Sequence, residues 1–116
     1  KLGKAGALIM AHENVRKRMT AGQFMKAIKK KIPAALPVIT FAQNMTFHWN
    51  GDTVHGLHVG PGHTDGDCII DFKKTNVIHA GDSFFNGFYT FIDEGSGASL
   101  KGLIGACING LRDPQR

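Results

Sequence analysis

The sequence predicts an α+β protein, because helix-type and strand-type patterns occupy different parts of the chain. Helical patterns occur near both ends, whereas alternating apolar and polar residues with turn dipeptides fill the middle. Of the 15 glycines, 12 lie between residues 51 and 110, so many tight turns are expected there. A length of 116 residues fits one domain, residues 1–116.

The first part of the chain predicts a strand that runs into a helix. The apolar run at residues 7–11 suits a buried strand, residues 13–19 are helix formers, and His12 at the junction can cap the helix. Residues 23–31 predict a second helical segment that Pro33 ends, and residues 33–37 predict an extended loop.

The middle of the chain predicts two strand pairs. Residues 45–49 alternate in polarity, and Asn50-Gly51 then supplies the dipeptide best suited to a two-residue hairpin before the chain returns over residues 53–59. Residues 67–72 and 77–80 form the second pair, joined by a polar turn.

A last helix is predicted by an apolar stripe at helical spacing, with Ser96 and Ser99 as candidate N-caps. The stripe consists of Leu100, Leu103, Ile104, Cys107, Ile108 and Leu111.

Composition excludes several classes of protein. No apolar run is long enough to span a membrane, so no membrane partner is expected. Cys68 and Cys107 have no CxxC spacing, which favours two small buried side chains over a disulfide or a structural zinc site. The net charge of +5 is concentrated in residues 1–31, which hold nine Lys and Arg against one acid. This cluster favours a solvated cationic surface over a nucleic-acid site, because no recognition motif accompanies it.

Two segments have the character of a binding site. In Gly60-Pro-Gly-His63-Thr-Asp-Gly-Asp67 the glycines free the backbone to present one imidazole at the end of a strand, with Thr64 and the acids available to orient it. In Ala80-Gly81-Asp82 a carboxylate directly follows a buried strand. His48 and His55 flank the hairpin, where cross-strand or solvent-facing roles are favoured over metal binding.

In this order, and with His63 and Asp82 spaced 19 positions apart, the two segments resemble the metallo-β-lactamase superfamily of metallohydrolases. Residues 91–97 and 9–14 resemble further segments of one hydrolase branch, so the similarity spans nearly the whole chain. The resemblance implies a partial αββα sandwich in which this chain supplies mainly one mixed or antiparallel sheet with flanking helices.

The resemblance also implies residue roles. His63 matches a histidine ligand of the first zinc, with Thr64 and Asp65 supporting it, and Asp82 matches the catalytic aspartate that bridges two zinc ions. His58 and His79 match no ligand and are interpreted as structural. Zinc-bound hydroxide in such enzymes attacks an ester, lactone, thioester or similar bond of a small-molecule substrate. An aspartate at the bridging position favours general hydrolase relatives over a true β-lactamase.

The sequence contains neither the His-x-His-x-Asp-His motif nor the last histidine ligand of the family. We therefore expect an internal segment of a zinc hydrolase, inactive by itself, whose upstream part could carry an export signal. The alternative is a non-catalytic module on the same scaffold. In both cases the incomplete sandwich is expected to leave an apolar face or strand edge uncovered, and we therefore expect a homo-oligomer that buries it. The aromatic residues after Asp82 either line a substrate pocket or cover the sheet edge; they are Phe84, Phe85, Phe88, Tyr89 and Phe91.

Overall fold

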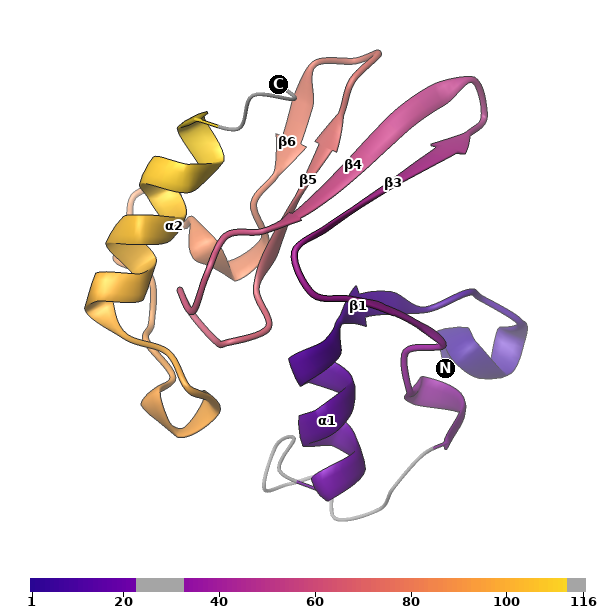
Figure 1. The fold of residues 1–116 in the computed structure, drawn as a ribbon, viewed down its shortest axis with the longest axis horizontal. Coiled ribbons are helices and arrows are strands. Elements are labelled where there is room, and N and C mark those ends of the chain that lie inside the picture. Colours follow the sequence, from indigo (N-terminus) through magenta and orange to yellow (C-terminus); the bar gives the residue numbers. More distant parts are fainter. Residues whose placement is uncertain (23–32, 113–116) are drawn as a thin grey trace. The chain divides into compact units, whose positions relative to one another are not determined.

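The computed structural model describes residues 1–22 and 33–112, with the side chains of the last helix described as far as residue 109. The chain divides into two compact units, residues 1–42 and 43–116 (Figure 1). Two helices, a parallel strand pair and a four-stranded antiparallel sheet confirm the predicted α+β class and are consistent with a partial sandwich of the expected kind.

The described residues of the first unit, 1–22 and 33–42, form a parallel strand pair and a helix. Strand β1 (Met10–His12) pairs with β2 (Ile39–Phe41) and leads directly into α1 (Glu13–Ala21), which confirms the predicted strand-to-helix junction. His12 is the N-cap, because its Nδ1 accepts a hydrogen bond from the Asn14 backbone N–H at 3.3 Å. Short 3-10 turns cover Leu2–Ala5 and Pro33–Ala35.

The segment at residues 33–37 is not extended throughout. The prediction of an extended loop over residues 33–37 is wrong for Pro33–Ala35, because these residues form a 3-10 turn in which the Leu36 N–H donates to the Pro33 carbonyl. Proline has the φ angle that such a turn needs at its first position. The predicted helix over residues 23–31 lies outside the described residues.

The second unit is built on a sheet with the strand order β3-β4-β5-β6, all neighbours antiparallel. The strands are β3 (Asn44–Trp49), β4 (Asp52–His58), β5 (Cys68–Phe72) and β6 (Val77–His79), which confirms both predicted pairs. Asn50 and Gly51 have φ angles of 52° and 72°, so the predicted hairpin turn has positive φ at both central residues.

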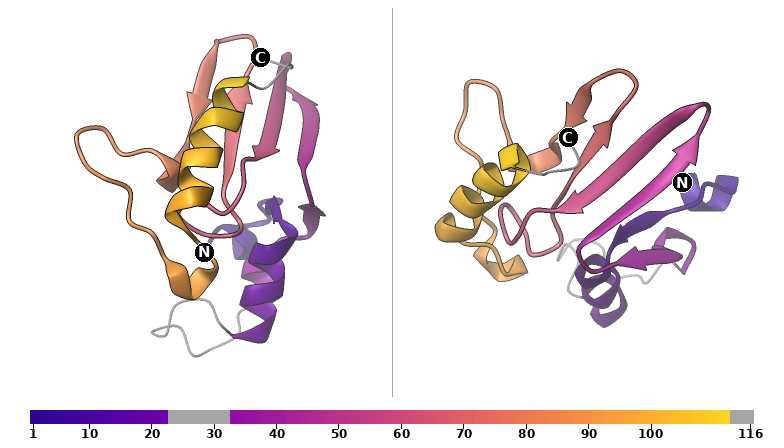
Figure 2. Two further views of the ribbon diagram at one scale, coloured as in Figure 1. Left: turned by 60° about the vertical axis from the view of Figure 1, so that its left-hand side comes forward. Right: turned by 45° about the horizontal axis from the view of Figure 1, so that its top comes forward.

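Helix α2 (Leu100–Arg112) lies alongside this sheet (Figure 2). The Ser99 hydroxyl accepts a hydrogen bond from the Gly102 N–H at 3.0 Å, which confirms Ser99 as its N-cap, whereas the Ser96 hydroxyl donates to Asp93. Ala106 packs in the core with Val59 and Ile69, next to Leu57, Ile78 and Ala80.

The buried face of α2 is not the whole predicted apolar stripe. Leu100, Ile104 and Ile108 remain exposed, because the small residues Gly102 and Ala106 make the closest approaches to the rest of the unit. Cys107 is also exposed and Cys68 is half-buried, so the prediction of two buried cysteines is wrong for Cys107; both thiols are free. Among the described residues, no helix has the length and apolar character required to cross a membrane.

Candidate functional site

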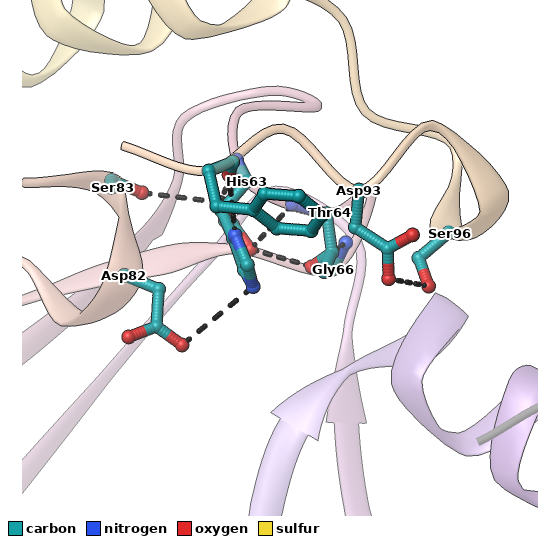
Figure 3. A network of polar contacts seen from close by, with 9 residues as sticks. His63, Thr64, Gly66, Asp82, Ser83, Asp93 and Ser96 are labelled. Carbon is teal, nitrogen blue, oxygen red and sulfur yellow. Dashed lines mark hydrogen bonds and ion pairs between the residues drawn. The ribbon is translucent and has the colours of Figure 1, made fainter. Parts of the chain in front are cut away.

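His63 and Asp82 lie at the same edge of the second unit's sheet. His63 belongs to the loop between β4 and β5, and Asp82 belongs to the 3-10 turn Gly81–Ser83 that follows β6. Because β5 and β6 are antiparallel, with Ile70 opposite His79, the end of β6 lies beside the start of β5. The topology therefore brings together two residues that are 19 positions apart in the sequence (Figure 3).

The two side chains face each other. The Nε2 atom of His63 is 3.8 Å from Oδ2 of Asp82, and the side chains are 22% and 63% exposed, respectively. This distance is too long for a direct hydrogen bond. The two side chains are therefore close neighbours that solvent can reach, and the imidazole faces the carboxylate with its Nε2 atom.

The other ring nitrogen of His63 fixes the orientation of the imidazole. Nδ1 is 2.6 Å from the backbone carbonyl oxygen of Phe91, and the two rings are tilted by 58° with centroids 6.0 Å apart. Because a carbonyl oxygen only accepts hydrogen bonds, Nδ1 must carry a proton. In the neutral imidazole this leaves a lone pair on Nε2, the atom that faces Asp82.

Asp67, directly before β5, joins the two loops. Its Oδ2 accepts hydrogen bonds from the His63 N–H at 2.6 Å and from the Ser83 hydroxyl at 3.2 Å. Its Oδ1 accepts from the Thr64 N–H at 3.0 Å and from the Thr64 hydroxyl at 2.5 Å. The sequence places Asp67 among the acids that can orient His63, because a carboxylate four positions further on in a glycine-rich loop can accept nearby N–H groups. Its contact with Ser83 in the second loop was not predicted.

A third loop contacts the His63 loop from residues 91–98. The Asp93 N–H donates to the His63 carbonyl at 3.0 Å, and the Asp65 N–H donates to the Ser96 carbonyl at 3.0 Å. The Ser96 hydroxyl donates to Asp93, which is the main reason why the pKa of Asp93 is lowered; backbone N–H groups and the nearby His63 lower it further. These contacts hold the carbonyl of Phe91 next to the imidazole.

The predicted supporting residues differ in what they contact. Thr64 supports the His63 loop through the carboxylate of Asp67, whereas Asp65 binds Ser96 through its backbone N–H. His48 and His55 contact Thr53 and Thr46 across the hairpin, at 3.0 and 2.9 Å, in the cross-strand positions that were predicted.

His58 and His79 make local contacts at the site's edge. His58 Nδ1 donates to the Asp67 carbonyl at 2.7 Å, and His79 Nδ1 accepts from the Gly81 N–H at 3.1 Å. Both contacts fit the structural interpretation of these residues. The aromatic residues that follow Asp82 are exposed, so they do not act as buried cover for the sheet edge; they are Phe84, Phe85, Phe88, Tyr89 and Phe91.

The chemistry of the His63 and Asp82 pair suits a divalent metal ion such as zinc. Zinc bonds to imidazole nitrogen and carboxylate oxygen at about 2.0–2.2 Å, so two ligands of a tetrahedral ion lie roughly 3.3 Å apart. The observed 3.8 Å exceeds that separation by a few tenths of an ångström. Within residues 1–22 and 33–112, however, no three His, Cys, Asp or Glu side chains are grouped to hold a metal ion. These residues thus fit as two ligands and do not complete a site.

Comparison with known proteins identifies the family of this chain. The family model for the metallo-beta-lactamase superfamily matches residues 4–110, and the chain therefore belongs to that superfamily. No curated protein matches the chain. Proteins of the superfamily generally bind metal ions, often zinc.

Proposed function

We propose that this chain contributes His63 and Asp82 as ligands to the zinc centre of a hydrolase that cleaves an ester, lactone, thioester or similar bond. The observation that carries the proposal is the geometry of this pair: Nε2 of His63 faces a carboxylate oxygen of Asp82 at 3.8 Å, while Nδ1 lies 2.6 Å from the Phe91 carbonyl oxygen. Superfamily membership supports the same class of chemistry.

Each residue has a distinct part in this function. His63 would bind the metal through Nε2, while the Phe91 carbonyl accepts a hydrogen bond from Nδ1–H and keeps the imidazole in the binding tautomer. Asp82 binds through an exposed carboxylate that a small substrate can reach. Bound zinc would supply a water molecule of lowered pKa and stabilise negative charge on the reacting carbonyl oxygen.

The complete centre needs further ligands. Catalytic zinc sites have three protein ligands, and the described residues offer two at this place. We therefore propose that the remaining ligands come from outside the described residues, and that the 116-residue chain by itself has no zinc-dependent hydrolase activity.

A zinc titration of the 116-residue protein, followed by NMR of the histidine side chains, tests the ligand assignment. We expect millimolar zinc to shift Nε2 of His63 and the Asp82 carboxyl carbon, and His63→Ala or Asp82→Ala to weaken binding at least tenfold. His48→Ala is the matched control, because His48 is an exposed histidine on the hairpin. Zinc that leaves His63 and Asp82 unchanged would overturn the assignment. Zinc-dependent hydrolysis of a lactone or thioester by this chain would contradict the proposed need for further ligands.

Self-association is the second candidate function, and the exposed aromatic loop favours it. Phe88 and Tyr89 are 81% and 101% exposed, and Phe84 and Phe91 are also largely exposed. Large aromatic side chains of this kind contribute strongly to protein interfaces. A second copy of the chain is the proposed partner. Light scattering should show a dimer that Phe88→Ser with Tyr89→Ser dissociates, while Val38→Ser, an exposed apolar position in the other unit, does not. A monomer at high concentration would contradict this candidate.

A further inference from the structure

The carboxylate of Asp67 contacts the loops of both candidate ligands. Its Oδ2 accepts from the backbone N–H of His63 and from the hydroxyl of Ser83, the residue after Asp82. Its Oδ1 accepts from the N–H and the hydroxyl of Thr64, the residue after His63. Four donors from two separate loops therefore converge on the side chain of Asp67.

Asp67 is itself anchored to the sheet. Its carbonyl oxygen accepts from Nδ1 of His58, the last residue of β4, at 2.7 Å, and its own position directly precedes β5. Asp67 thus links the end of β4 and the start of β5 to the loops that contain His63 and Asp82. Ser83 is buried, so its hydroxyl has little alternative contact with water.

The carboxylate of Asp67 lies close to the backbone of Gly62. A Cβ added at Gly62 would lie 3.1 Å from Oδ2 of Asp67 and 3.6 Å from the Ser83 hydroxyl oxygen. Gly62 is buried, and its lack of a side chain lets the carboxylate lie against the backbone of the His63 loop. An uncharged amide cannot replace the carboxylate here, because its NH₂ group would face a donor.

We infer that Asp67 is the positioning residue of this site: it holds the loops of His63 and Asp82 so that the two side chains stay within reach of a shared metal ion. This inference rests on the proposed zinc function. Charge-assisted hydrogen bonds from backbone N–H groups are short and strong, and groups that orient metal ligands typically contribute about 10- to 100-fold to metal affinity. Asp67 acts through the two loops and not as a ligand, since both of its oxygens accept hydrogen bonds from the protein.

Asp67→Asn is the test, measured first without metal. The amide proton of His63 should resonate far downfield in the original protein, because its nitrogen is 2.6 Å from Oδ2, and it should move upfield and exchange faster with solvent in Asp67→Asn. Ser83→Ala should leave this proton in place and broaden the signals of Asp82, because it removes only the contact to the second loop. An unchanged His63 amide in Asp67→Asn would overturn the inference whether or not zinc binds.

Zinc affinity is the second readout. Asp67→Asn should weaken zinc binding about 10- to 100-fold, and Ser83→Ala should weaken it less. Asp71→Asn is the matched control, because Asp71 is a buried carboxylate in the same part of the sheet that pairs with Lys73 at 2.8 Å. This variant should lower the melting temperature and keep the zinc affinity. Equal losses of affinity in Asp67→Asn and Asp71→Asn would mean that Asp67 acts only through stability. If the original protein binds no zinc, the metal-free amide signal still decides the role of Asp67 separately from the proposed function.

Discussion

His12 and His63 each donate a hydrogen bond to a backbone carbonyl, His12 through Nε2 and His63 through Nδ1. Nε2 of His12 is 2.9 Å from the Ala42 carbonyl oxygen while its Nδ1 accepts from Asn14, whereas Nδ1 of His63 is 2.6 Å from the Phe91 carbonyl oxygen. The contacts require a proton on Nε2 of His12 and on Nδ1 of His63. The same residue type thus serves as a helix cap in one unit and presents an unprotonated Nε2 to a carboxylate in the other.

The first prediction is that the neutral forms of these two histidines are opposite tautomers. Nitrogen-15 shifts of the imidazole rings at pH 8 should assign the proton to Nδ1 in His63 and to Nε2 in His12, which serves as the internal control. The physical reason is that each protonated nitrogen donates to a carbonyl that cannot donate in return. A proton on Nε2 of neutral His63 would contradict the structure of the site.

The second prediction concerns two glycines in α2. A Cβ at Gly102 would lie 2.0 Å from the carbonyl oxygen of Pro61, whereas a Cβ at Gly105 meets nothing within 4 Å. Gly102→Ala should therefore destabilise the protein by about 1–3 kcal/mol, because backbone must shift. Gly105→Ala should stabilise it by up to about 1 kcal/mol, because alanine is the better helix former.

Urea unfolding of the two variants measures this difference, and each serves as the control for the other. Gly102→Ala should also disturb the NMR signals of the His63 loop, which contains Pro61. Equal stability of the two variants would mean that α2 does not approach Pro61 as closely as the structure has it.

Local patterns predicted most of the secondary structure. The Asn50-Gly51 turn was predictable because both residues tolerate positive φ, which the structure shows at both. Ser99 as N-cap was predictable for a similar reason, since its hydroxyl needs only the N–H of Gly102, three residues away. Such features depend on neighbouring residues and are therefore visible in the sequence.

Features that depend on distant residues were not predictable in this way. The position of β2 depends on parallel pairing with β1, and the role of Asp67 depends on a donor, Ser83, that is 16 residues away. The burial of α2 depends on where the small residue Ala106 meets Val59 and Ile69, which the apolar spacing alone does not reveal. His63 and Asp82 could be singled out because each lies in a glycine-containing loop that follows the end of a strand, but their closeness in space depends on the antiparallel topology.

The third prediction concerns Glu13 at the start of α1. The Lys17 ammonium, 3.0 Å away, lowers the pKa of Glu13 by a hydrogen bond and by its charge. Because the pKa of Glu13 is lower in the folded protein, the ion pair stabilises α1 at pH values above the ordinary pKa of glutamate. This contribution is lost as the pH falls through the pKa of Glu13 in the folded protein. NMR titration of the Glu13 carboxyl carbon should show a higher pKa in Lys17→Met. Lys17→Arg, which keeps the charge, should retain the low value; identical titrations in all three proteins would contradict the ion pair.

The last prediction is that the two thiols differ in reactivity. Burial, with a smaller effect of the neighbouring Asp67 charge, raises the pKa of Cys68, so less of this thiol is ionised at a given pH. Cys107 is exposed on α2. Iodoacetamide at pH 8 should therefore modify Cys107 first, and Cys107→Ser should abolish the fast phase while Cys68→Ser leaves it intact. Mass spectrometry of the digested protein measures both sites, and adding urea should remove the difference, because unfolding returns Cys68 to water. A fast phase at Cys68 in the folded protein would show that its strand does not bury the thiol.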